Sequence, residues 1–121
     1  IYLSLHQSPL YPGTGLQSRD NCYNFPLDPG ANEKTYLNIL SKACEIINQF
    51  SPTLIGISAG FDTYQGDPLS HFNLEVESYR QIGDKIAGLN IPVFITMEGG
   101  YSRNLPECVL SFIQGLDKNP H

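Results

Sequence analysis

The sequence predicts an α/β fold, with a parallel sheet and helices in a three-layer α/β/α arrangement. Apolar runs at residues 1–6, 54–59 and 93–97 have the length and composition of strands. Segments with helical periodicity follow these runs along the chain, so strands and helices alternate. Strands joined in this way need right-handed crossovers and therefore run parallel. We treat residues 1–121 as a single domain, since this length is typical of one.

Composition narrows the class of protein. Hydrophobic residues make up 40% of the chain and charged residues 16%, which fits a globular domain. The net charge of −5 argues against nucleic-acid binding, which needs clustered Lys and Arg, and favours a cationic substrate or partner. No apolar run approaches the ~20 residues of a membrane span. Three widely spaced cysteines without a Cys-x-x-Cys pair indicate a reduced, cytoplasmic protein.

The first predicted strand, residues 1–6, starts at the first residue without a preceding turn or cap. A domain seldom begins inside its own sheet, so we expect a piece of a larger fold, or a neighbouring strand supplied by another chain. Unpaired strand edges favour pairing. We therefore expect a homodimer, or a complementing chain, on the side of this strand.

Local signals place the remaining elements. Residues 7–30 are rich in Pro and Gly and predict a loop, with Tyr23–Leu27 extended. Apolar residues recur at helical spacing from Asn32 to Phe50, where Ser51-Pro52 ends the helix. These helical positions are Tyr36, Leu40, Ala43, Ile47 and Phe50.

The strand at Leu54–Ala59 is apolar on both faces, and the polarity changes abruptly after it. Gly60 permits a sharp turn, and Gly66-Asp67-Pro68 predicts a rigid loop. Asp62 follows the carboxyl end of the strand, where open α/β sheets bind ligands. Asp62 is therefore the first candidate for a catalytic or ligand-binding residue.

The last third of the chain predicts two helices around the strand at Val93–Met97. The first covers residues 75–89, and its start should fray because Glu75 is a poor N-cap. Asn104 and Glu107 suggest a capping box for the second. The tail, residues 117–121, is expected to be disordered. Parallel strands would bring His6, Asp62 and Tyr101 to one rim of the sheet.

The chain resembles the histone deacetylase and acetylpolyamine amidohydrolase family, which has the arginase/deacetylase fold. The motifs that carry the resemblance occur in the family's order: Ser4-Leu5-His6, Tyr11-Pro12-Gly13-Thr14-Gly15, Ser58-Ala59-Gly60-Phe61-Asp62, Gly66-Asp67-Pro68-Leu69, Phe72-Asn73-Leu74 and Glu98-Gly99-Gly100-Tyr101. The resemblance covers the carboxyl-terminal part of a deacetylase domain. It implies hydrolysis of an acetyl-lysine or acetylpolyamine amide by a zinc-bound water.

The resemblance also implies roles for two residues of the predicted rim. Asp62 matches the position of a zinc ligand, whereas spacing alone favours an aspartate that caps backbone amides in its loop. Tyr101 matches the catalytic tyrosine that stabilises the oxyanion. Without the resemblance, Tyr101 would be read as an exposed loop residue.

Other residues match binding positions of the family. Tyr11, Leu69, Gly99 and Gly100 correspond to the substrate channel, although Tyr11 and Leu69 could be ordinary packing residues. A further pair, Ser4 and Leu5, corresponds to a structural site for a monovalent cation, whose other ligands are absent from this chain.

The departures from the family concern catalysis. A zinc amidohydrolase needs three protein ligands and a general base, which the family takes from an Asp-x-His pair and a His-His dyad. The chain has His6, His71 and His121, and none is in such an arrangement. We therefore expect a fragment of a zinc-dependent amidohydrolase that is inactive and binds no zinc alone. The alternative is a non-catalytic binding or assembly module.

A rival motif, Gly-x-Ser-x-Gly at residues 56–60, resembles the nucleophile elbow of serine hydrolases. That elbow needs a helix directly after the serine. A Gly-Asp-Pro loop follows instead, so we expect Ser58 to be structural.

Overall fold

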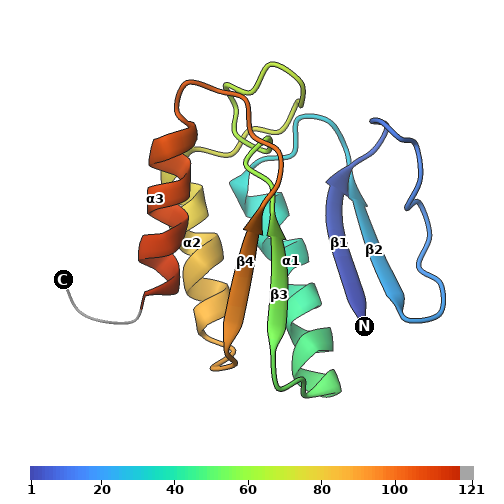
Figure 1. The fold of residues 1–121 in the computed structure, drawn as a ribbon. Coiled ribbons are helices and arrows are strands. Elements are labelled where there is room, and N and C mark those ends of the chain that lie inside the picture. Colours follow the sequence, from blue (N-terminus) through green and yellow to red (C-terminus); the bar gives the residue numbers. More distant parts are fainter. Residues whose placement is uncertain (118–121) are drawn as a thin grey trace.

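The computed structural model describes residues 1–117, and Figure 1 shows how its strands and helices are arranged. In chain order the elements are β1 (Tyr2–Gln7), β2 (Cys22–Leu27), α1 (Glu33–Phe50), β3 (Ile55–Ala59), α2 (Val76–Ala87), β4 (Val93–Met97) and α3 (Leu105–Leu116). Of the tail that we expected to be disordered, Asp117 caps α3 through its N–H, which donates to Ile113 O at 3.0 Å. The rest of that tail lies outside the described residues.

The strands pair in parallel, as predicted, but in two separate pairs within the described residues. β1 pairs with β2, with Tyr2 opposite Cys22, and β3 pairs with β4, with Ile55 opposite Val93. The extended segment expected at residues 23–27 is thus a full strand. The reason is its in-register pairing with β1, which local sequence signals do not report.

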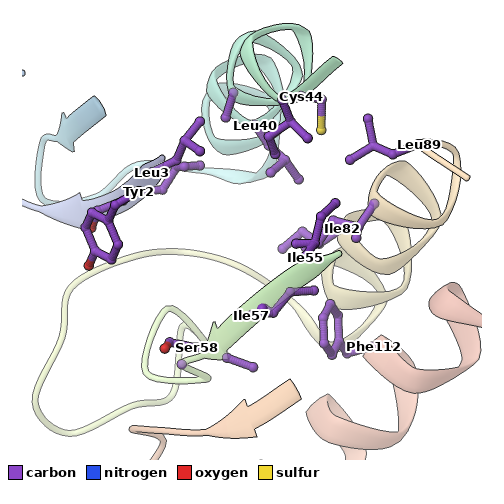
Figure 2. A pocket seen from close by; sticks show the side chains of 18 of the residues that line it. Tyr2, Leu3, Leu40, Cys44, Ile55, Ile57, Ser58, Ile82, Leu89 and Phe112 are labelled. Carbon is purple, nitrogen blue, oxygen red and sulfur yellow. The ribbon is translucent and has the colours of Figure 1, made fainter. Parts of the chain in front are cut away.

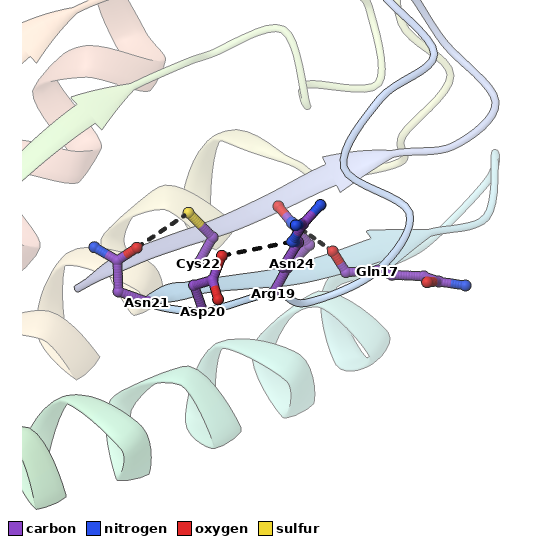
Figure 3. A network of polar contacts seen from close by, with 6 residues as sticks. All are labelled: Gln17, Arg19, Asp20, Asn21, Cys22 and Asn24. Atoms are coloured by element: carbon purple, nitrogen blue, oxygen red, sulfur yellow. Dashed lines mark hydrogen bonds and ion pairs between the residues drawn. The ribbon is translucent and has the colours of Figure 1, made fainter.

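Polar contacts shape the connection that leads into β2 (Figure 3). Asn24 Nδ2 donates to Gln17 O at 2.9 Å, and the Arg19 side chain forms an exposed ion pair with Asp20. Backbone bonds in both directions between Arg19 and Cys22 close a tight turn. These contacts return the chain to β1 without a crossover helix.

Helix caps explain where α1 begins and ends. Asn32 Oδ1 accepts a hydrogen bond from Thr35 N at 3.0 Å, which satisfies a free donor of the first turn. At the other end Ser51 adopts a left-handed conformation with φ 54°, and its N–H donates to Ile47 O at 3.0 Å. Both ends agree with the sequence-based bounds.

The helices α2 and α3 begin where the sequence predicted, after Glu75 and Asn104, but their capping differs from the prediction. The start of α2 does not depend on a good N-cap residue, because Ser78 Oγ accepts from Glu75 N at 3.0 Å and donates to Glu33 Oε2 of α1 at 2.6 Å. For α3, Asn104 precedes the helix but makes no side-chain capping bond. Its ψ of 11° is close to helical, whereas an N-cap side chain caps from an extended backbone.

One hydrophobic core unites all three helices with β3. Its buried members are Leu40, Ala59, Phe61, Leu74, Tyr79, Ile82, Cys108 and Phe112. Along β3, Ile57 and Ala59 turn toward this core while Gly56 and Ser58 are exposed. This alternation leaves the other face of β3 open. No helix among residues 1–117 is long and apolar enough to cross a membrane.

A cavity of about 410 Å³ lies between β1 and β3 (Figure 2). We call it the interstrand slot. Its lining includes Leu3 and Leu5 of β1, Ile55 and Ile57 of β3, and Leu40, Cys44, Ile82 and Leu89 on or next to α1 and α2. The strands β1 and β3 therefore flank the slot, and α1 and α2 form its floor. Most of the side chains that line it are apolar.

Candidate functional site

A second cavity, of about 420 Å³, lies where β1 and β3 end. Its lining includes His6, Tyr11, Asp62, Thr63 and Ser70. We call it the rim cavity. His6 and Asp62 thus line one cavity, as predicted from strands whose carboxyl ends share an edge, whereas Tyr101 is not among its lining residues.

Asp62 stands three residues beyond the end of β3 and is partly buried in the wall of the rim cavity. Burial raises the pKa of its carboxyl group above the ordinary value, and the negative charge of Asp67 raises it further. A hydrogen bond from its own backbone N–H acts in the opposite direction. The ionised carboxylate is therefore held in a place that disfavours its charge, where a bound cation would stabilise it.

Glycines bring the turn after β4 against this carboxylate. Phe61 N donates to Gly99 O at 2.8 Å, which ties that turn to the end of β3. A Cβ atom on Gly99 would lie 2.9 Å from Asp62 Oδ2, and one on Gly100 would lie 3.0 Å from Phe61 Cβ. Gly100 also has φ of +139°, which favours glycine. Backbone conformation and close contacts thus require glycine at position 100, whereas a side chain at position 99 would displace the Asp62 carboxylate.

The predicted catalytic residue and the two other predicted channel residues are exposed. Tyr101, Leu69 and Tyr11 are 59%, 60% and 94% exposed, respectively. The backbones of Tyr101 and Leu69 are joined through the carboxylate of Asp67, which accepts a hydrogen bond from each. Tyr11 lies in the connection between β1 and β2 and lines the rim cavity. The structure therefore links Tyr101 and Leu69 through one carboxylate.

The predicted cation position at Ser4 takes part in a short hydrogen-bond chain. Ser4 Oγ lies 2.9 Å from His6 Nδ1, and His6 Nε2 lies 2.9 Å from Gly15 O. Because a carbonyl oxygen can only accept, Nε2 carries the proton, and in neutral His6 the Ser4 hydroxyl donates to Nδ1. The lone pairs of Ser4 Oγ stay available to a cation. Leu5 packs its side chain against the core.

The residues present do not make a zinc site by themselves. Within residues 1–117 no three His, Cys, Asp or Glu side chains are grouped so that they could hold a metal ion. A zinc site takes three or four protein ligands, and Asp62 is a single carboxylate donor. Asp62 has the donor chemistry of one ligand of such a site.

Ser58 does not form a nucleophile elbow. It lies within β3, and an irregular loop rather than a helix follows Ala59. The serine-hydrolase interpretation of residues 56–60 is therefore wrong, because the elbow depends on a sharp turn from strand to helix.

Sequence reasoning missed two connections at the rim. We interpreted Asp67 only as a turn residue, yet its second oxygen reaches Tyr101, 34 residues away. We assigned no role to His6, which joins Ser4 to the loop at Gly15. The Gly-Asp-Pro motif marked Asp67 as unusual, but no local pattern could reveal its distant donor.

Comparisons with known proteins identify the family and the fold. Residues 1–116 match the family described as Histone deacetylase domain. Acetylpolyamine amidohydrolase 1 of Pseudomonas aeruginosa is 39% identical over 112 residues, covering 84% of this chain and 32% of that protein. A probable deacetylase of Methanothermobacter thermautotrophicus is 33% identical over 131 residues, covering 97% of this chain and 39% of that protein.

A crystal structure of acetylpolyamine aminohydrolase from Burkholderia pseudomallei superposes with a TM-score of 0.89 at 28% identity. The match covers 95% of this chain and 37% of the enzyme. The arginase/deacetylase fold implied by the sequence motifs is confirmed. The chain spans well under half the length of these relatives, and it belongs to the histone deacetylase domain family.

Proposed function

We propose that this chain is the carboxyl-terminal part of a zinc-dependent amidohydrolase domain that removes acetyl groups from acetylated amines. The observation that carries the proposal is the contact between the Asp62 carboxylate and the turn at Gly99, which also bears Tyr101. Asp62 would be one metal ligand. Zinc, when bound, would supply the Lewis acid of the reaction.

Tyr101 would donate its hydroxyl to the oxyanion that develops on the acetyl carbonyl. Its exposed side chain is free to reach a substrate entering from solvent. Leu69 and Tyr11 would line the path of the acyl group. The net charge of −5 suits a cationic amine, and relatives named acetylpolyamine amidohydrolases support this substrate class.

The remaining ligands and the general base would come from another segment, and the interstrand slot is where we propose that it enters. β1 and β3 are parallel to their own partners, and each leaves one edge unpaired toward the slot. A strand inserted there would bury the apolar walls and could end at the rim beside Asp62. A second copy of this chain would bring no Asp-x-His or His-His motif, so we favour a complementing deacetylase segment.

We further propose a reducing, cytoplasmic location. Cys22, Cys44 and Cys108 are free thiols in the structure, and burial raises the pKa of Cys108 to about 11. A thiol with a raised pKa reacts slowly, so Cys108 suits a structural role.

An acetate-release assay tests the proposal in two stages. The purified chain with zinc should not hydrolyse acetyl-lysine or acetylspermidine. Zinc-dependent hydrolysis abolished by Asp62→Ala but not by Asp28→Ala, a change at an exposed carboxylate, would show that the chain is sufficient alone.

With a complementing deacetylase segment present, hydrolysis should appear and Tyr101→Phe should lower turnover by about 10²-fold, as loss of an oxyanion donor does. Tyr23→Phe is the matched control, because Tyr23 lies on β2 and is not among the residues that line either cavity. Equal turnover for the two variants would remove Tyr101 from the mechanism. The non-catalytic alternative predicts a complex without hydrolysis.

A further inference from the structure

Asp67 is the most heavily engaged carboxylate near the rim. Its residue is only 7% exposed, although it lies in a loop. Its own N–H donates to Tyr64 O at 3.0 Å, which closes the turn that contains Gly66. A carboxylate is rarely buried to this degree unless hydrogen bonds compensate the loss of water.

One oxygen of Asp67 organises its own loop. Oδ1 accepts from Leu69 N at 2.8 Å and from Ser70 N at 3.1 Å. Such local bonds are the usual work of Asp in a turn. They fix the backbone of Leu69 and explain the rigidity expected of the Gly-Asp-Pro segment.

The other carboxylate oxygen of Asp67 accepts a hydrogen bond from outside the loop. Oδ2 accepts from Tyr101 N at 3.0 Å, which joins the loop after β3 to the turn after β4. That turn is also held at Gly99, whose carbonyl accepts from Phe61 N at 2.8 Å. The backbone on either side of Gly100 therefore has two anchors, and Asp67 is the one at Tyr101 itself.

The loop that carries Asp67 is in turn fastened to β1. Ser70 Oγ donates to Gln7 Oε1 at 3.1 Å, and His71 N donates to the same oxygen at 2.9 Å. Gln7 is 7% exposed. Tyr101 is thus linked to the first strand through Asp67, Ser70 and Gln7.

We propose that Asp67 is a positioning residue that sets the Tyr101 backbone, and hence the aim of its hydroxyl, relative to Leu69 and the rim cavity. The inference rests on the proposed role of Tyr101 in catalysis. Asp67 itself would contact no reacting atom. It acts through hydrogen bonds to backbone amides on both sides of the predicted acyl path.

Asp67→Asn separates the two halves of this arrangement. Asn has one acceptor oxygen and one NH₂ donor, whereas all three partners of Asp67 are N–H donors. Keeping the two local bonds to Leu69 and Ser70 places the NH₂ group against Tyr101 N. The substitution should therefore release Tyr101 while preserving the local turn.

Amide hydrogen exchange in the ¹⁵N-labelled chain tests this directly. Hydrogen bonds to charged groups contribute about 1.5–3 kcal/mol, so the Tyr101 amide should exchange about 10-fold faster or more in Asp67→Asn. Asp28→Asn, which removes the same charge from an exposed position, should leave Tyr101 unchanged. Unchanged Tyr101 exchange in Asp67→Asn would overturn the proposal.

A measurement on the unsubstituted chain covers the case in which Asp67→Asn does not fold. A through-hydrogen-bond coupling between the Tyr101 nitrogen and the Asp67 carboxyl carbon is expected. A Tyr101 amide that exchanges as fast as an unprotected one would refute the bond.

The complemented enzyme separates this inference from the proposed function. Asp67→Asn should lower kcat more than it changes KM. If Tyr101→Phe lowers turnover and Asp67→Asn does not, positioning fails while the proposed function stands. If neither variant changes the turnover of an active complex, the proposed function of Tyr101 fails. The hydrogen-exchange result then still shows whether Asp67 accepts a hydrogen bond from the Tyr101 amide.

Discussion

The crossing of α2 and α3 depends on two glycines, Gly83 and Gly115, and replacing one of them should destabilise the fold. A Cβ on Gly115 would lie 2.9 Å from Asp84 N and closer still to Arg80 O, against 3.4–4 Å for ordinary contact. A Cβ on Gly83 would likewise meet the backbone of α3. Since backbone atoms cannot rotate aside, the helices would have to separate.

The magnitude follows from two opposing terms. Overpacking costs about 1–3 kcal/mol, and contact with rigid backbone places Gly115→Ala at about 3 kcal/mol. Alanine recovers about 1 kcal/mol through its higher helix propensity. The net loss in the free energy of unfolding is about 2 kcal/mol, which moves a urea midpoint by about 1 M for a typical slope.

Urea unfolding followed by circular dichroism measures this loss. Gly88→Ala is the control at the C-cap of α2, because Gly88 has φ of −62° and its Cβ would lie 3.3 Å from Lys85 O. We expect that variant to stay within about 1 kcal/mol of the parent, since a compatible Gly→Ala change is mild. Equal midpoints for the two variants would refute the view that close helix approach sets this packing.

Three further predictions concern the rim, β3 and the slot. Burial raises the pKa of Asp62, so ionisation of this residue above its unfolded pKa of about 4 weakens the fold. Asp62→Asn should therefore raise the melting temperature at pH 7, and this gain should vanish near pH 3. A lower melting temperature of the variant at pH 7 would contradict this. A fluorophosphonate probe should leave Ser58 unlabelled, because no nucleophile elbow surrounds it, and stoichiometric labelling would revive the serine-hydrolase interpretation. Light scattering at micromolar concentration should show that the isolated chain self-associates, because the strand edges facing the slot are unpaired. A monomer that melts cooperatively would argue against this self-association.

The sequence by itself determined the elements whose signals are local. Val93–Met97 is a strand with the predicted bounds, and α1 begins after Asn32 and ends before Ser51 as expected. Hydrophobic periodicity and capping chemistry act over a few residues, so the chain reports them directly. Motif order also identified the family, because the motifs are read directly along the chain.

Tertiary structure alone decided how these pieces meet. The pairing of β2 with β1, the slot between β1 and β3 and the bond from Asp67 to Tyr101 join segments far apart in sequence. Gly83 and Gly115 carry no local signal of their partnership, because two helices must cross before their backbones exclude a Cβ atom. Such contacts depend on the relative placement of whole elements, which side-chain patterns within one element do not specify.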